Sequence, residues 1–193
     1  MEQSVCAEEH GSTVMRDANV SDKETIDINP KMGGAISVKK EASGTLIHFK
    51  EAPVLLAHFP VELAKKFLML GREEKYASHI DILRKGQIGR DMFLICQGRI
   101  SVWKQNIKLG DLVKGDVFGE LVMFRDHYRI ATVKTEEPSV VLRYNRQCLL
   151  DFFARQDPRY FNIYTMNIIE ILRRKLIATN ALVVRLEEEL LRQ

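Results

Sequence analysis

The middle of the chain, residues 76–144, alternates apolar and polar side chains over short distances. Ile80 and Ile82 have polar neighbours, residues 99–104 alternate again, and residues 91–96 form a mostly apolar run. A period of two indicates strands with one buried face, and a short apolar run suits a strand inside a sandwich core. Glycines separate these segments at positions 86, 89, 98, 110, 115 and 119. The pattern therefore predicts a β-sandwich or barrel.

Helical spacing precedes this region. Leu63, Phe67 and Leu70 recur three and four residues apart after Pro60, which suits a first helical turn. Residues 1–45 instead are rich in Ser, Asp, Glu, Gly and Lys and show no sustained periodicity. Such a segment cannot bury enough apolar surface to offset its ordering entropy, so it is predicted to be a disordered tail.

Helical patterns return at the C-terminal end. Asn145 can cap a helix over residues 146–156, and Asp157-Pro158 ends that helix and starts the next. Residues 159–192 contain neither proline nor glycine. Positions alternately three and four apart form a heptad seam of about three repeats with one polar member. The seam is Ile169, Leu172, Leu176, Thr179, Val183, Leu186 and Leu190.

The length of this last helix has a structural consequence. A helix of about 30 residues spans about 45 Å, which is longer than the domain it follows. Its distal half is therefore expected to need a partner, and a parallel homodimer through residues 165–190 supplies one. In the alternative, the seam packs on the β core of its own chain, which would cover the first half better than the second.

Composition narrows the classes of function. The chain has 193 residues and a net charge of +3, too weak a bias to indicate nucleic acid as a partner. No apolar run reaches the length of a membrane span, and the N-terminus lacks a basic start followed by an apolar block. A cytoplasmic protein without membrane association is expected. The five histidines are dispersed, so no metal is expected.

Residues 115–133 (GDVFGELVMFRDHYRIATV) combine the features of an anion site. Gly119 lets the backbone approach a ligand, and free N–H groups of a turn beginning at Glu120 and Leu121 point toward an anion. Arg129, nine residues after Glu120, can close over the same anion with a bidentate contact. The Glu120 carboxylate only accepts hydrogen bonds, so it suits a sugar hydroxyl. A phosphate beside a ribose hydroxyl indicates a nucleotide.

This segment resembles the phosphate-binding cassette of the cyclic-nucleotide-binding domains, found in catabolite activator proteins and protein kinase A regulatory subunits. Residues 86–98 resemble the family's first glycine segment, and the resemblance covers residues 60–193 in order. It implies a mainly β fold with flanking helices (α+β), a double-stranded β-helix or jelly-roll sandwich followed by a long C-terminal helix. The matching cassette residues are Phe118-Gly119-Glu120, Leu121-Val122-Met123 and Arg129-Ile130-Ala131-Thr132.

The resemblance implies a regulatory sensor and not an enzyme. Ile130 offers no hydroxyl beside the arginine, which favours cAMP over cGMP as the ligand. Two positions depart from the family: Tyr128 stands where proline is common, and Ile130 lacks the hydroxyl that a serine would add to the phosphate. The implied phosphate and ribose contacts are Phe118, Gly119, Glu120, Leu121, Arg129, Ile130 and Ala131. The implied base contacts are Thr179 and Asn180.

Together these features predict a domain organisation. Residues 1–45 are the tail, residues 46–157 the cyclic-nucleotide-binding-like β-roll with flanking helices, and residues 158–193 a long helix that serves as lid and dimerisation seam. The chain ends at Gln193, soon after the seam, so no helix-turn-helix and no DNA binding is expected. The output is expected to be an unidentified protein partner.

Two other functions fit parts of the pattern. A nucleotide-free dimerisation or scaffold module could retain the fold, and would be indicated if Tyr128 covered Arg129 and Glu120. A metal-dependent, cupin-type enzyme would need two histidines and a carboxylate around one metal. His79 and His127 are the only histidines in the β region, and neither has a motif around it.

Overall fold

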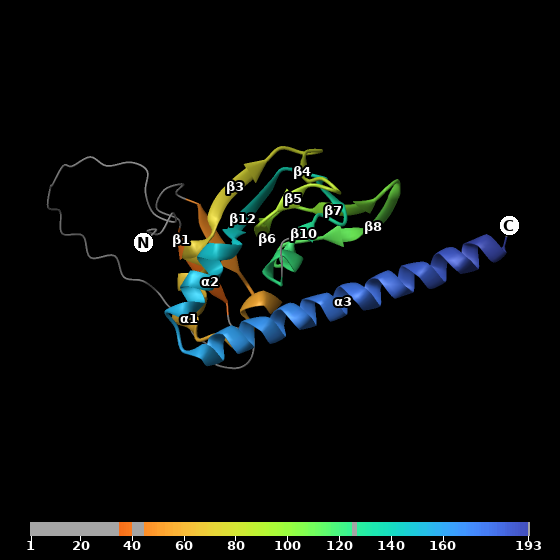
Figure 1. Ribbon diagram of the computed structural model, residues 1–193. Coiled ribbons are helices and arrows are strands. Elements are labelled where there is room, and N and C mark those ends of the chain that lie inside the picture. The colour runs from red at the N-terminus through yellow and green to blue at the C-terminus, as the bar shows by residue number, and fades with distance from the viewer. Residues whose placement is uncertain (1–34, 40–44, 125–126, 193) are drawn as a thin grey trace, which may run out of the picture.

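Two antiparallel sheets of four strands each form the centre of the protein (Figure 1). The computed structural model describes residues 35–39, 45–124 and 127–192. One sheet has the order β4 (Asp81–Leu83), β11 (Thr132–Thr135), β7 (Ile100–Lys104) and β8 (Ile107–Leu112). The other has the order β3 (Arg72–Tyr76), β12 (Ser139–Asn145), β6 (Asp91–Gln97) and β9 (Val117–Phe118).

The remaining elements surround these sheets. Two short antiparallel pairs are β1 (Ile36–Lys39) with β2 (Leu46–Phe49), and β5 (Ile88–Gly89) with β10 (His127–Tyr128). The helices are η1 (Val54–Leu56), α1 (Val61–Leu70), η2 (Glu120–Met123), α2 (Arg146–Ala154) and α3 (Pro158–Leu191). Within the described residues, no helix is both long and apolar enough to cross a membrane.

Both faces of strand β6 are buried, which explains its apolar run. Side chains on one face of β6 pack in a single cluster with side chains of the other sheet. The two sheets therefore form the predicted jelly-roll sandwich. The other face packs under the helices. The inter-sheet cluster is Leu83, Phe93, Ile95, Ile100, Phe118, Val133 and Val141.

The helices cover the second face with an aromatic cluster. Phe67 of α1 is fully buried, and its ring lies 4.8 Å from that of Tyr144 and 5.9 Å from that of Tyr164. Phe153 of α2 lies 4.8 Å from Tyr164 of α3. Asn167 of α3 donates to the carbonyl oxygens of residues 55 and 57, at 3.1 and 2.8 Å. These contacts attach the first half of α3 to the β-roll.

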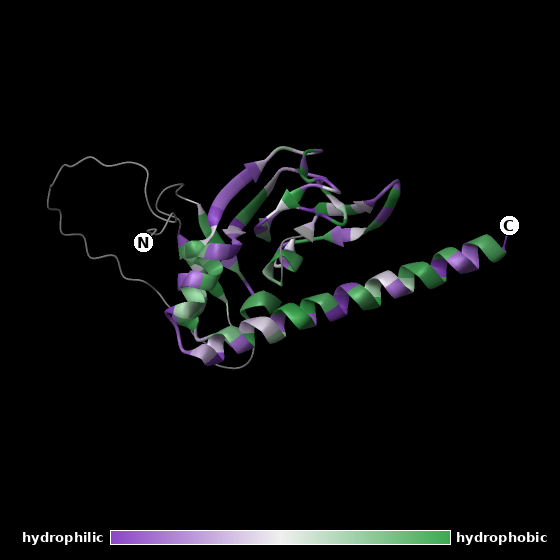
Figure 2. Ribbon diagram, viewed as in Figure 1, coloured by the Kyte–Doolittle hydropathy of each residue, from purple (hydrophilic) through white to green (hydrophobic). Residues whose placement is uncertain are grey.

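The predicted cap at Asn145 and the predicted start of the last helix at Asp157-Pro158 are confirmed. The Asn145 side chain accepts a hydrogen bond from the Gln147 amide, and the Asp157 side chain accepts one from the Arg159 amide. Pro158 occupies the first turn of α3. Figure 2 shows α3 continuing well past the sheets with apolar and polar residues interspersed along it.

The N-terminal boundary was wrong in part. Residues 1–45 were expected to be disordered, but Ile36–Lys39 form β1 and pair with β2. Ile36 and Val38 alternate with polar residues and are buried against the core, a period-two signal too short to stand out. Residues 1–34 and 40–44 lie outside the described part of the chain.

Strands β3 and β8 were not predicted, because both are edge strands with charged sequences. β3 pairs only with β12, and its glutamates form ion pairs across the sheet surface, including one between Glu74 and Arg143. β8 pairs only with β7, and Lys108 pairs with Asp111 within it. Edge strands carry such charges because one side of their backbone is unpaired.

Candidate functional site

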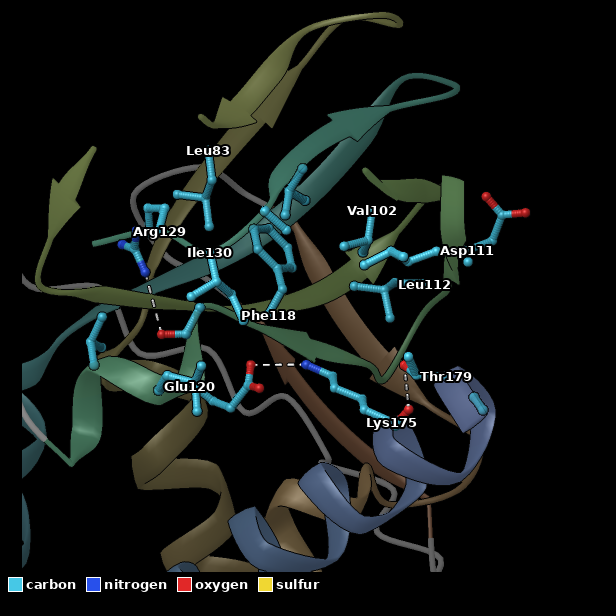
Figure 3. Close-up of a pocket in the computed structure, with 18 of the residues that line it drawn as sticks. Leu83, Val102, Asp111, Leu112, Phe118, Glu120, Arg129, Ile130, Lys175 and Thr179 are labelled. Atoms are coloured by element: carbon cyan, nitrogen blue, oxygen red, sulfur yellow. Dashed lines mark hydrogen bonds and ion pairs between the residues drawn. The ribbon is translucent and has the colours of Figure 1, made fainter. Parts of the chain in front are cut away.

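A cavity of about 280 Å³ lies between the β9–η2 segment, the sheet of β4, β11, β7 and β8, and helix α3 (Figure 3). Most of its wall is apolar, including Leu83, Val102 and Leu112. The charged residues that line it are Asp111, Glu120, Arg129 and Lys175. Such a mixture of apolar wall and few polar groups is typical of a small-molecule site.

Gly119 makes the turn that opens this site. Phe118 ends β9 with its ring stacked on Phe93 at 4.8 Å, which fixes the strand beneath the turn. Gly119 then has a φ of 74° and precedes η2. A Cβ atom there would come within 2.9 Å of both the Asp91 carbonyl oxygen and the Arg129 guanidinium. Only glycine satisfies both the left-handed backbone and the close approach.

Arg129 is held in the site by backbone oxygens. Its side chain donates to the carbonyl oxygen of Asp91 at 2.7 Å and to that of Gly119 at 3.4 Å. The guanidinium lies so close to Gly89 that a Cβ atom there would approach its nitrogens to 2.5 Å. The residue is only 8% exposed, and this burial lowers the pKa of Arg129. No described carboxylate forms a salt bridge with it, so its charge is available to an anion.

Glu120 is 4% exposed and pairs with a residue of α3. The Lys175 ammonium lies 2.9 Å from its carboxylate and also donates to the Val117 carbonyl oxygen at 2.8 Å. The carboxylate oxygen in this pair is Oε2, and Oε1 remains a hydrogen-bond acceptor. Helix α3 is thereby attached to the same segment that carries Glu120.

The fold brings the predicted cassette residues together. Phe118, Gly119, Glu120, Leu121, Arg129, Ile130 and Ala131 all line the cavity. Tyr128 and Ile130 also border it, and they are 67% and 63% exposed. Of the two predicted base contacts, Thr179 lines the cavity and Asn180 does not. Asn180 is exposed on α3, so its predicted role has no support from its position in this chain.

Two features of the site were missed or misplaced by the sequence reasoning. Lys175 was given no role, although it lies four residues, or one helical turn, before Thr179 on the same face of α3. The sequence pattern also did not separate the faces of η2: Leu121 lines the cavity, while Val122 is buried in the cluster under the helices. The short η2 turn places successive residues on different faces, which a sequence pattern of four residues cannot resolve.

Residues 73–156 match the cyclic nucleotide-binding domain family. A cGMP-dependent protein kinase, isozyme 1, of Drosophila melanogaster is 30% identical over 101 residues, which is 49% of this chain and 13% of the kinase. The match thus spans a small part of that relative. The cyclic nucleotide-binding fold is a regulatory and not a catalytic domain.

Solved structures share this fold. The catabolite activator protein of Thermus thermophilus has a TM-score of 0.59 and 20% identity, covering 69% of this chain and 63% of that one. A cyclic nucleotide-binding domain from Methylobacillus flagellatus has a TM-score of 0.61 and 17% identity, covering 66% and 74%. Within the described residues, no three His, Cys, Asp or Glu side chains group as a metal site.

Proposed function

We propose that this protein is a cyclic-nucleotide sensor, with cAMP as its ligand. The observation that carries the proposal is Arg129, a buried guanidinium without a carboxylate salt-bridge partner among the described residues, in a cavity that also contains Glu120. The cyclic phosphate of such a ligand has one negative charge, which a guanidinium binds in a bidentate manner. Glu120 accepts the ribose 2′-hydroxyl. Leu83, Val102 and Leu112 supply an apolar surface beside these groups.

The choice of cAMP rests on Ile130 and on the helix. Ile130 lines the cavity next to Arg129 and has no hydroxyl to donate, and cGMP selectivity often relies on such a hydroxyl. Thr179 reaches the cavity from α3, and its hydroxyl donates to the Lys175 carbonyl oxygen at 2.9 Å. The Thr179 oxygen remains an acceptor for an amino group of the base.

The signal passes from the cassette to the C-terminal helices. Met123 of η2 and Phe152 of α2 both pack against the buried cluster that contains Val122 and Leu149. A ligand that draws the cassette toward Arg129 therefore acts on α2, and the junction at Asp157-Pro158 serves as the hinge to α3. The ligand shifts this equilibrium only by its differential affinity for the two states.

Helix α3 carries the output as a parallel homodimer. Ile169, Leu176, Val183 and Leu190 follow one another at intervals of seven residues and are between 47% and 70% exposed. Such a repeat is the seam of a two-stranded coiled coil, and its burial in the pair removes apolar surface from water. The protein acts in the cytoplasm on a protein partner, without enzymatic activity of its own.

Isothermal titration of the purified chain with cAMP and with cGMP tests the proposal. Arg129→Ala is expected to weaken cAMP binding by about 2–5 kcal/mol, as for other buried charge contacts. Arg84→Ala is the matched control, because Arg84 is an exposed arginine of the neighbouring turn that pairs only with Asp81 among the described residues. Equal affinity of wild type and Arg129→Ala would contradict the site. Tighter binding of cGMP would reverse the assignment of the ligand.

A second candidate is a dimerisation module that retains the fold without a ligand. It is favoured by the internal partners of the polar groups, since Arg129 donates to two backbone oxygens and Glu120 pairs with Lys175. Absence of heat and of thermal stabilisation with both nucleotides, together with a stable dimer in sedimentation, would support this candidate.

A further inference from the structure

Asp91 occupies a position between the cavity and helix α2. It is the first residue of β6, where β6 pairs with the last residue of β12, Asn145. Its backbone carbonyl oxygen accepts from Arg129 at 2.7 Å. Its side-chain carboxylate accepts two further hydrogen bonds. Oδ2 accepts from the Arg143 guanidinium at 2.7 Å, and Oδ1 accepts from the side-chain amide of Asn145 at 3.2 Å. One residue thus contacts the buried arginine through its backbone and the end of β12 through its side chain.

Asn145 connects this position to α2. Its Oδ1 accepts from the Gln147 amide at 2.9 Å and so caps the helix. The backbone amide of Arg146, the residue after Asn145, donates to the carbonyl oxygen of Arg90 at 2.8 Å. Arg90 immediately precedes Asp91 in the chain. The first turn of α2 is therefore hydrogen-bonded to the segment that holds the Arg129 guanidinium.

The geometry also limits how the guanidinium can move. It is confined between Gly89 and the two carbonyl oxygens of Asp91 and Gly119. Two of its five N–H groups are used by these oxygens, and the others remain for an anion. A displacement of Asp91 changes the orientation of the remaining donors, and a pull on Arg129 by a ligand is transmitted to Asp91.

We propose that Asp91 is a positioning residue that orients Arg129 for the ligand phosphate and couples it, through Asn145, to the N-terminus of α2. The ligand side of this inference rests on the proposed function. The contacts that carry the coupling between Arg129 and α2 are all made between protein groups, so the coupling can be tested in the free protein as well. By linkage, the ligand and the first turn of α2 stabilise each other to the same extent.

A double-mutant cycle in the ligand-free protein tests the coupling. The readout is the hydrogen-exchange rate of the Arg146 and Gln147 amides. Arg129→Ala is expected to raise these rates about fivefold or more, the lower end of typical couplings between sites. Asn145→Ser keeps a capping oxygen but removes the amide that donates to Asp91. In that background Arg129→Ala is expected to change the rates less than about twofold, since the connection is already lost.

Glu74→Gln is the matched control, because Glu74 shares Arg143 with Asp91 but does not contact Asn145 or Arg129. In this background the fivefold effect of Arg129→Ala is expected to persist. Unchanged exchange in Arg129→Ala, or the same increase in the Asn145→Ser background, would overturn the coupling.

The orientation of Arg129 is tested by the NMR signal of its Nε–H group. The signal is expected to be sharp in wild type and in the conservative variant Asp91→Asn, and exchange-broadened in Asp91→Ala. A sharp signal in Asp91→Ala would contradict the positioning role. With cAMP present, exchange of the two α2 amides should slow in wild type and in Glu74→Gln but not in Asn145→Ser. If wild type binds no cyclic nucleotide, the proposed function fails, and the ligand-free cycle still decides the role of Asp91.

Discussion

Lys175 of α3 places its ammonium 2.9 Å from the buried carboxylate of Glu120, 55 residues earlier in the chain. This pair joins the long helix to the segment that makes the cavity. Lys175→Met would leave a buried carboxylate without its cation, so we expect the free energy of unfolding to fall by about 2 kcal/mol. Chemical denaturation measures the change.

The double variant Lys175→Met with Glu120→Gln should recover part of that loss, because the unpaired charge is then removed. Arg174→Met is the matched control, since the exposed Arg174 pairs with the partly exposed side chain of Glu170 on the same helix. An equal loss in Arg174→Met and Lys175→Met would show that the Glu120 contact adds nothing to stability.

Gly89→Ala is expected to abolish nucleotide binding with little loss of stability. The new Cβ atom would lie 2.5 Å from a nitrogen of Arg129, and the φ of Gly89 lies outside the left-handed region. The guanidinium is the end of a flexible side chain and moves aside, away from its two carbonyl partners. Titration with cAMP and thermal unfolding measure the two effects. Gly110 also borders the cavity, but a Cβ atom there would meet nothing within 4 Å. The control variant Gly110→Ala should therefore bind the nucleotide normally.

Ile130→Ser is expected to tighten nucleotide binding about tenfold or more. Ile130 borders the cavity beside Arg129, and a serine hydroxyl there can donate to the ligand phosphate. A hydrogen bond to a charged group contributes about 1.5–3 kcal/mol. Competition with a fluorescent cyclic nucleotide measures the affinity. Ile130→Ala separates the added hydroxyl from the loss of bulk, and an equal gain in both variants would assign the effect to bulk.

Val183→Asp is expected to convert the proposed homodimer into a monomer. Val183 is half-exposed and lies on the heptad seam with Leu176 and Leu190. A carboxylate at this position would be buried against its own copy across a parallel seam. Sedimentation velocity measures the oligomeric state. Val184→Asp is the matched control, because Val184 is equally exposed but one position off the seam. A monomeric wild type would contradict the dimer.

Tyr76 makes part of the stability sensitive to alkaline pH. Burial, followed by its hydrogen bond to Glu74, raises the pKa of Tyr76 to about 12. An unfolded tyrosine ionises at about pH 10. The folded protein favours the neutral phenol, so this stabilisation is present below pH 10 and is lost as pH rises toward 12. Tyr76→Phe should flatten the decline in unfolding free energy over that range, measured by chemical denaturation at a series of pH values.

Local patterns in the sequence were sufficient for much of the fold. Strand β7, the cap at Asn145 and the start at Asp157-Pro158 depend on neighbours in the chain, and they were confirmed. The alternation of Ile80 and Ile82 predicted the wrong buried face, because in β4 Leu83 is buried and Ile80 is exposed. β3 and β8 were missed because edge strands carry charges that resemble loops. The apolar strand β6 was recognised because both of its faces are buried.

The chemical character of the site was also readable in the sequence, because the turn at Gly119 and the pair Glu120 and Arg129 lie within one short segment. The partners of these residues were not readable. Lys175 reaches Glu120, and Asp91 holds Arg129, across 55 and 38 positions. Local backbone preferences act over a few residues, whereas ion pairs and buried hydrogen bonds depend on which distant elements the core brings together. The sequence by itself determined most of the elements and the residues of the candidate site, and the tertiary structure alone decided what holds them in place.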